Sequence, residues 1–209
     1  MTDKTTLVFD TETNGKRPKG KNVPLGDEPA ITQIAAILYL GRREVAHLSC
    51  FVQPLDGMGR PAAIPTEQFF IDSGITQETV DAVGLPLKTG LAEFNQLIKL
   101  ADRLVAHNMQ FDDPITRGNY MRLAAPQRDY WDTPKFCTMQ SLTDVLKLPG
   151  KFGYKYPSAD EAYRALVDPM GFEGAHDAMV DVKACADILW AIEDKGLDLW
   201  KLPENWPKE

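Results

Sequence analysis

The order of apolar segments along the chain limits the folds it can adopt more than any other feature. Three apolar segments, at residues 5–9, 31–40 and 44–53, precede the first long helical pattern, and only the turn sequence GRR separates the last two. Beyond residue 90, segments of strand length alternate with segments whose apolar residues recur at helical spacing. A meander followed by alternating strands and helices predicts an α/β or α+β domain with a mixed five-stranded sheet flanked by helices.

Composition places the chain among ordinary globular proteins. Its 209 residues are 44% hydrophobic and 25% charged, as is typical of folded domains. The longest apolar run, residues 34–40, is too short to cross a bilayer, and the polar N-terminus lacks the apolar core of a signal peptide. The cysteines Cys50, Cys137 and Cys185 lie in apolar stretches and are interpreted as reduced thiols. We therefore expect a cytoplasmic protein that does not span a membrane.

Two carboxylates stand at the end of the first apolar segment. The sequence LVFDTETNG places Asp10 and Glu12 two residues apart, so both side chains project from the same face of a strand. Like charges at this spacing repel unless water or a cation lies between them, and carboxylate oxygens are ligands that Mg²⁺ and Mn²⁺ prefer. Taken alone, such a pair is more often a solvated strand end, so its interpretation depends on other acidic residues.

Two later segments supply acidic residues in similar settings. The segment VAHNMQFDD carries Asp112 and Asp113 where a strand passes into a helix. An acidic residue there also favours the helix dipole, and for Asp113 this interpretation is kept. In GAHDAMVDVKA, Asp177 is the predicted N-cap residue, so His176 lies just before the helix and Asp181 in its first turns. A histidine in that turn has a pKa suited to proton transfer near neutral pH.

Together these segments resemble the motifs of a known family. FDTET, AHNMQFD and HDAMVD are similar, in this order, to the three exonuclease motifs of the DEDDh, or DnaQ-like, family. This is the group of the proofreading epsilon subunit of bacterial DNA polymerase III, ribonuclease T and the TREX exonucleases. The resemblance implies a ribonuclease H-like fold and 3′→5′ exonuclease activity by two-metal hydrolysis. It assigns as catalytic residues the metal ligands Asp10, Glu12, Asp112 and Asp181 and the general base His176.

The implied metal ions also change the meaning of the net charge. A formal charge of −7 is unusual for a protein that binds nucleic acid. Two Mg²⁺ ions, for which Mn²⁺ is the expected substitute, would offset part of it, and a protein that holds a strand end needs few phosphate contacts. The expected reaction removes nucleoside 5′-monophosphates from the 3′ ends of single-stranded DNA. Trimming of RNA ends by the same fold is the alternative, and the sequence does not separate the two.

The residues around the first motif are candidate substrate contacts. A long segment, residues 14–30, leaves the expected active site and carries Lys16 and Arg17. We expect these two cations to contact the substrate backbone, although a solubilising loop is an equal alternative. In the family, backbone groups beside the ligands meet the terminal nucleotide, which suggests Thr11 and Thr13 as further contacts.

Two other segments carry candidate supporting or binding residues. His107 and Asn108 precede the second acidic motif and are interpreted as supporting residues, with Asn108 also a candidate substrate contact. In KFGYKYP, residues 151–157, the side chains of Tyr154 and Tyr156 either stack on bases or pack under the preceding helix. Packing is the preferred interpretation for these tyrosines.

The last residues, 196–209, form a predicted tail after an exonuclease domain assigned to residues 1–195. The sequence GLDLWKLPENWPKE contains two tryptophans and two prolines, and we expect it to pack back on the domain. Its LDLW portion also resembles the end of the peptide that binds bacterial sliding clamps, although Gly196 replaces the usual glutamine. A sliding clamp or a polymerase bound through this tail, and a non-catalytic end-binding subunit, are the alternatives. The presence of every motif residue argues against the non-catalytic one.

Overall fold

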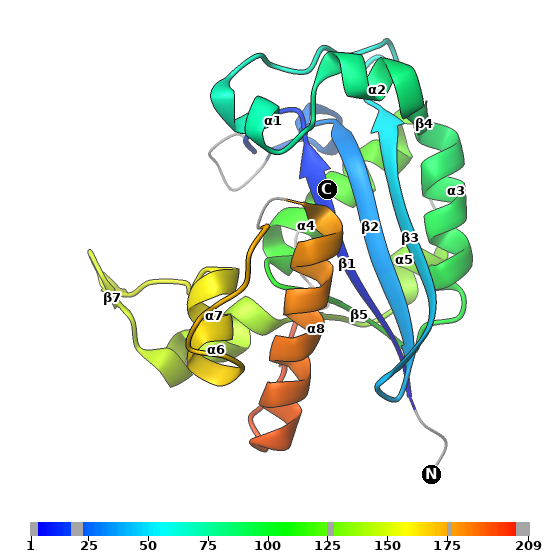
Figure 1. Ribbon diagram of the computed structural model, residues 1–209. Helices are drawn as coiled ribbons and strands as arrows, with labels where there is room; N and C mark the ends of the chain where they lie inside the picture. Colours follow the sequence, from blue (N-terminus) through cyan, green and yellow to red (C-terminus); the bar gives the residue numbers. More distant parts are fainter. Residues whose placement is uncertain (1–3, 18–22, 125–127, 175–176, 204–209) are drawn as a thin grey trace.

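The computed structural model describes residues 4–17, 23–124, 128–174 and 177–203 (Figure 1). Within these ranges, no helix combines the length and the apolar character needed to cross a membrane.

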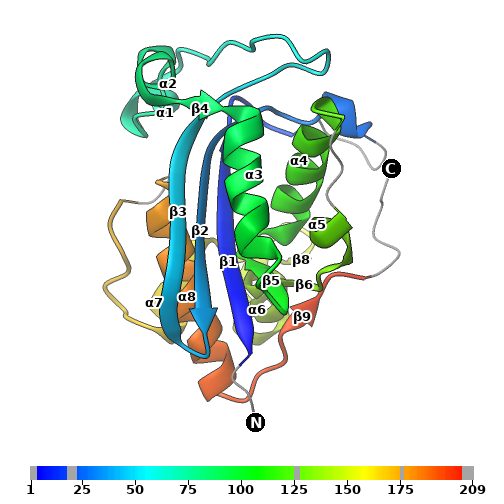
Figure 2. The ribbon, with the colours of Figure 1, turned by 90° about the vertical axis from the view of Figure 1, so that its right-hand side faces the viewer.

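A mixed sheet forms the centre of the described structure. Its seven strands lie in the order β4-β3-β2-β1-β5-β6-β9 (Figure 2). The predicted meander is confirmed, because β1 (Thr5–Thr13), β2 (Ile31–Leu40) and β3 (Arg43–Gln53) pair antiparallel in sequence order. On the other side of β1, β5 (Arg103–Ala106) and β6 (Lys135–Cys137) add in parallel.

Two short edge strands make this sheet wider than the predicted five strands. β4 (Leu85–Pro86) pairs in parallel with the end of β3, and β9 (Trp200–Lys201) pairs antiparallel with β6. Each has two residues, too few for the alternating pattern by which a strand is identified in a sequence. β9 places part of the predicted tail in the sheet, and Leu202 beside it is buried. A further pair, β7 (Pro149–Gly150) and β8 (Gly153–Tyr154), forms a separate hairpin.

Helices cover both faces of the sheet (Figure 2). α3 (Leu87–Ile98) and α4 (Met109–Arg122) lie on one face, over the larger apolar core. α8 (Ala178–Asp194) lies on the other face and packs Val182 and Leu189 against the sheet. The remaining helices are the 3-10 helix η1 (Leu25–Asp27), α1 (Gln68–Asp72), α2 (Gln77–Val83), α5 (Arg128–Asp132), α6 (Thr138–Leu146) and α7 (Ala159–Leu166).

The central strand β1 belongs to both halves of the core because its side chains alternate between the faces. Leu7 and Phe9 join the core under α3 and α4, whereas Val8 joins the core under α8. The strand continues beyond its predicted end at residue 9, because its ladder with β2 holds the next four polar residues extended as far as Thr13. The acidic pair of the first motif therefore lies on one face of the strand, as its spacing predicted.

Local signals for helix ends are confirmed. Ser158 and Glu161 form the predicted capping box at the start of α7. Asp177 caps α8 with its side chain, as predicted. Gly196 follows α8 with a φ of 63°, a left-handed conformation that a glycine adopts without a steric penalty.

Candidate active site

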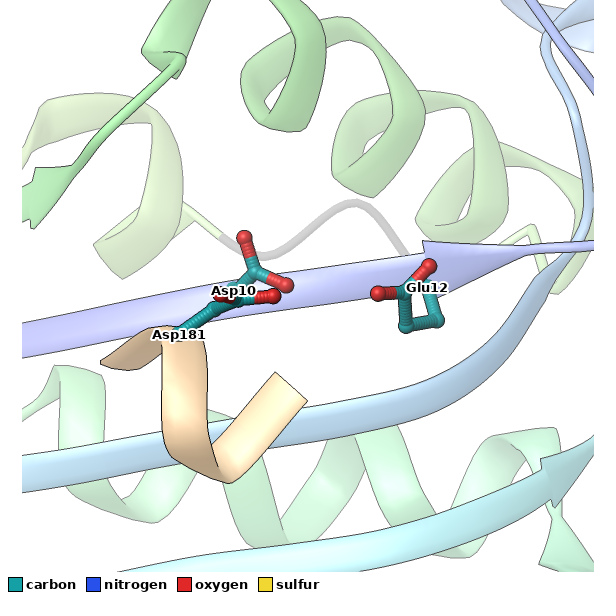
Figure 3. A group of neighbouring side chains, drawn as sticks. All are labelled: Asp10, Glu12 and Asp181. Atoms are coloured by element: carbon teal, nitrogen blue, oxygen red, sulfur yellow. The ribbon is translucent and has the colours of Figure 1, made fainter. Parts of the chain in front are cut away.

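Three carboxylates from two elements meet at the C-terminal end of β1. Asp10 and Glu12 point to the face covered by α8, and Asp181 lies in the first turn of that helix (Figure 3). One carboxylate oxygen from each residue lies within 4.8 Å of the other two. The fold thus brings an acidic pair and a distant third carboxylate into one group, which we call the acidic triad.

Hydrogen bonds at the start of α8 fix the position of its first turn. The Oδ1 atom of Asp177 accepts from the backbone N–H groups of Met179 and Val180, at 2.9 and 3.3 Å. The buried Gln33 of β2 accepts from the backbone N–H of Ala178 at 3.4 Å. Since one of these bonds comes from the sheet itself, the turn that carries the third carboxylate is tied to the strand beside β1.

Burial and mutual repulsion raise the pKa values within the triad. The pKa of Glu12 rises from 4.5 to about 8, first because burial removes water and then because Asp181 and Asp112 repel the ionised form. Burial, followed by the charges of Asp112, Glu12 and Asp181, raises the pKa of Asp10 well above its ordinary range. At neutral pH the triad therefore favours bound protons, and a divalent cation that displaces them would also relieve the repulsion.

These raised pKa values predict an unusual pH dependence of stability in the metal-free protein. Between pH 4.5 and about 8 the folded state keeps a proton on Glu12 that the unfolded chain has released, so raising the pH favours unfolding. We expect the Tm in EDTA to fall by on the order of 10 °C across this window. Excess Mg²⁺ should remove most of the fall, since the ion takes the place of the protons.

Differential scanning calorimetry with EDTA or Mg²⁺ tests this expectation. In a Glu12→Gln variant, whose side chain does not titrate, the fall in EDTA should become smaller. A Tm that rises with pH in EDTA, with no effect of the substitution, would contradict it.

Asp112 approaches the site from the opposite side of β1. It lies in the first turn of α4, and its Oδ1 atom accepts from the backbone N–H and the hydroxyl of Thr11, at 3.2 and 2.8 Å. The residue is 1% exposed, and burial raises its pKa to about 7 against the lowering effect of these hydrogen bonds. Asp112 does not belong to the group within 4.8 Å. The structure therefore brings together three of the four predicted ligands and places the fourth beside Thr11.

The predicted general base, His176, lies outside the described residues. The described residues on either side of it are Gly174, whose φ is 82°, and Asp177, the N-cap of α8. The position expected for His176, just before the helix, follows from that N-cap, and its role stays a prediction.

A cavity of about 730 Å³ opens beside the triad. Glu12 lines it together with Thr13 and Lys16, two of the predicted substrate contacts. Phe70 of α1 and Phe111 of α4 contribute aromatic walls. No sequence signal connects Phe70 with the acidic motifs, because a five-residue helix carries no usable periodicity and only the fold brings it to β1.

Two of the other predicted substrate contacts, Thr11 and Arg17, make bonds within the protein. Thr11 holds Asp112, as described above. Arg17 donates from Nε and Nη2 to the two carboxylate oxygens of Glu28, at 2.6 and 2.7 Å, and from Nη1 to the carbonyl of Gln110 at 3.3 Å. The Glu28 side chain is fully buried, so this ion pair fixes the segment after β1. Asn108 is the N-cap residue of α4, without a capping bond from its side chain.

The chemistry of the triad fits a hard divalent cation. Asp10, Glu12 and Asp181 offer only carboxylate oxygens, the donors that Mg²⁺ and Mn²⁺ prefer over nitrogen and sulfur. Burial first, and then repulsion from the neighbouring carboxylates, raises the pKa values of Asp10 and Glu12. Such an arrangement is unfavourable for three free anions and favourable around a positive ion.

A protein-family model described as Exonuclease (RNase_T) matches residues 7–189 of the chain. No curated protein sequence matches the chain.

Solved structures share the fold. E. coli Exonuclease I in complex with a dT13 oligonucleotide gives a TM-score of 0.69 at 18% identity over 91% of this chain and 41% of that one. Exonuclease X in complex with 5′ overhanging duplex DNA gives a TM-score of 0.59 at 21% identity. This match covers 92% of this chain and 94% of Exonuclease X. Cell-death related nuclease 4 gives a TM-score of 0.67 at 17% identity. This match covers 94% of this chain and 66% of that nuclease. The chain thus spans about two fifths of Exonuclease I and most of Exonuclease X. The likeness confirms the predicted fold class.

Proposed function

This chain belongs to the exonuclease family whose model matches residues 7–189, and we propose that it is a metal-dependent 3′→5′ exonuclease. Its proposed substrate is the 3′ end of single-stranded DNA, from which it removes nucleoside 5′-monophosphates. The observation that carries the proposal is the acidic triad, whose carboxylates converge within 4.8 Å at the end of the central strand. The DNA in the complexes of Exonuclease I and Exonuclease X supports a DNA strand as the substrate.

In this proposal Asp10, Glu12, Asp112 and Asp181 hold two Mg²⁺ ions. Bound divalent ions supply activation of the attacking water and charge stabilisation at the leaving 3′ oxygen. The chain orients the ligands through the ladder of β1 and the capped start of α8.

The remaining steps use His176 and solvent. Water attacks the phosphorus of the last phosphodiester, and His176 accepts the proton that this water releases. The bond between phosphorus and the 3′ oxygen breaks, and the 3′ oxygen takes a proton from solvent. The products are a nucleoside 5′-monophosphate and a strand shorter by one nucleotide with a free 3′ hydroxyl.

We assign the terminal nucleotide to the cavity beside Glu12. Phe70 and Phe111 give its walls the aromatic surface on which a base packs. Lys16 lines the same cavity and is the proposed partner of a phosphate. Thr13 lies at the strand end of the cavity, where its backbone is the proposed contact of the terminal sugar.

Digestion of 5′-labelled single-stranded oligonucleotides tests the function directly. With Mg²⁺ we expect a ladder of products that shorten from the 3′ end, and with EDTA no products. DNA and RNA of the same sequence, run in parallel, identify the preferred sugar; faster cleavage of RNA would favour the alternative of RNA trimming. Absence of cleavage of either substrate with Mg²⁺ or Mn²⁺ would overturn the proposal.

The tail residues that resemble a clamp-binding peptide contribute to the fold. Leu197 and Leu199 pack against the cores around α8, and Trp200 belongs to β9. A peptide that binds a partner must leave such contacts. A sliding clamp or a polymerase bound through this segment stays a prediction, and its binding would have to release these contacts.

A further inference from the structure

An exposed hairpin leaves the body of the protein beside α6 and α7 (Figure 1). Its strands, β7 and β8, leave Lys151 and Phe152 as a two-residue tip. Two glycines are needed for this shape. Gly153 has a φ of 118°, and a Cβ on Gly150 would lie 2.9 Å from the carbonyl oxygen of Gly153. The backbone therefore presents the tip in a defined conformation.

The aromatic side chains of this segment face solvent. Phe152 is 93% exposed, and Tyr154 and Tyr156 are 52% and 54% exposed. The preferred sequence interpretation, that the tyrosines pack under a helix, is therefore wrong. The short hairpin projects away from the core, so about half of the surface of each tyrosine stays exposed (Figure 1). The Nζ atom of Lys151 lies 5.2 Å from the centre of the Phe152 ring, so a cation accompanies the most exposed aromatic ring.

The charge of the segment is opposite to that of the whole chain. Residues 145–158 contain Lys147, Lys151 and Lys155 and no acidic residue, in a chain with a net charge of −7. Lys155 forms an ion pair with Glu161 of α7 at the base of the hairpin. Lys151 at the tip is therefore the cation that a polyanion would meet first.

The base of the hairpin is joined to the second acidic motif through His107. Its Nε2 atom lies 3.1 Å from the carbonyl oxygen of Pro157, and its Nδ1 atom lies 2.9 Å from the hydroxyl of Thr138. Since a carbonyl only accepts, Nε2 carries the proton and Nδ1 accepts from Thr138. Burial lowers the pKa of His107, which keeps this neutral tautomer. His107 precedes Asn108, the N-cap residue of α4, whose first turn carries Asp112.

We propose that the β7–β8 hairpin, residues 147–156, is a second contact for the single-stranded substrate, upstream of the terminal nucleotide. The inference rests on the proposed function. In this arrangement Phe152 stacks on a base, while Lys151 and Lys147 meet backbone phosphates. Exposed aromatic rings beside cations are the combination by which proteins bind single strands without sequence preference. A protein partner would need to be strongly acidic to match the same charges.

Equilibrium binding tests the proposal without requiring cleavage. Anisotropy of a labelled oligonucleotide of about 20 nucleotides, in EDTA, compares the full chain with its Phe152→Ala variant. We expect binding about tenfold weaker for Phe152→Ala and near wild type for Phe152→Trp, which retains a stacking surface. For Lys151→Ser, the slope of log K against log salt should fall by about 0.7.

Controls and substrate length separate a contact by the hairpin from a general effect. Met58→Ala removes an exposed apolar side chain elsewhere, and Lys88→Ser removes an exposed cation on α3; both should bind as the wild type does. The preference of the wild type for the long oligonucleotide over one of about four nucleotides should shrink about tenfold in Phe152→Ala. Equal binding by wild type and Phe152→Ala, or equal losses on both lengths, would overturn the proposal. Weakened binding in a chain that cleaves nothing would support the hairpin and count against the exonuclease.

Discussion

An Asp10→Asn variant is expected to lose nuclease activity by about 10³-fold or more. In the proposed mechanism, a metal ion held by this carboxylate would supply several kcal/mol of transition-state stabilisation, and each 1.36 kcal/mol corresponds to a factor of ten. The same change should make the metal-free protein more stable. Burial and three neighbouring carboxylates raise the pKa of Asp10. Asparagine has nearly the same shape as aspartate but no charge, so the substitution removes an unfavourable buried charge. Activity and stability are thus expected to change in opposite directions.

Rates on a labelled single strand and melting curves in EDTA give the two measurements. Added Mg²⁺ should raise the Tm of the wild type more than that of the variant, because the variant has lost a ligand. Asp144→Asn, at an exposed position on α6, is the matched control and should change neither rate nor Tm. Loss of activity with an equal loss of stability in EDTA would mean that Asp10 supports the fold and not the reaction.

An Asp113→Ala variant is expected to be destabilised by about 3–5 kcal/mol, because it leaves the buried guanidinium of Arg117 without its carboxylate partner. The Asp113 side chain is fully buried, and both of its oxygens accept from Nε of Arg117, at 3.0 and 2.9 Å. The Nζ atom of the buried Lys135 lies 3.9 Å from the same carboxylate. The guanidinium of Arg117 also stacks over the ring of Trp131. To reach water, the guanidinium would have to give up this contact.

The neighbouring Asp112 provides the sharpest comparison. Asp113→Ala should lower the Tm by about 10 °C, while the folded fraction retains nuclease activity at permissive temperature. Asp112→Ala should abolish activity with a smaller change in Tm, because it removes a carboxylate whose pKa burial already raises. Asp129→Ala, at an exposed position on α5, serves as the control for loss of an acidic residue. Similar effects of the two adjacent substitutions on both measurements would contradict this separation.

The parts of the fold with long, regular patterns were predicted from the sequence. α8 is an example, because Ala178, Val182, Cys185 and Leu189 follow its helical period and all are buried against the sheet or α7. α4 was harder to delimit. It begins at Met109, before the predicted start, and it buries Thr116, Arg117 and Asn119. Because these polar residues mark no apolar face, periodicity could not show where the predicted helix begins or that it is buried on most sides.

The acidic residues of the site were predicted from motifs, whereas their surroundings were not. Asp10, Glu12 and Asp181 converge as the spacing and the resemblance implied. Glu28 and Phe70 carry no such pattern, since their roles depend on the path of the chain after β1 and on the packing of α1. Arg17 illustrates the difference: its charge suggested a substrate contact, and only the structure shows the buried carboxylate that it neutralises.

The alternation along β1 ties catalytic competence to correct strand registration during folding. Phe9 packs on Phe94 at a ring distance of 5.3 Å, while the residues on either side of it belong to the opposite face. A slip of one residue would turn Asp10 toward that aromatic core and Phe9 toward α8. Misregistered chains would therefore be both unstable and inactive, so the population that survives folding is also the population able to assemble the triad.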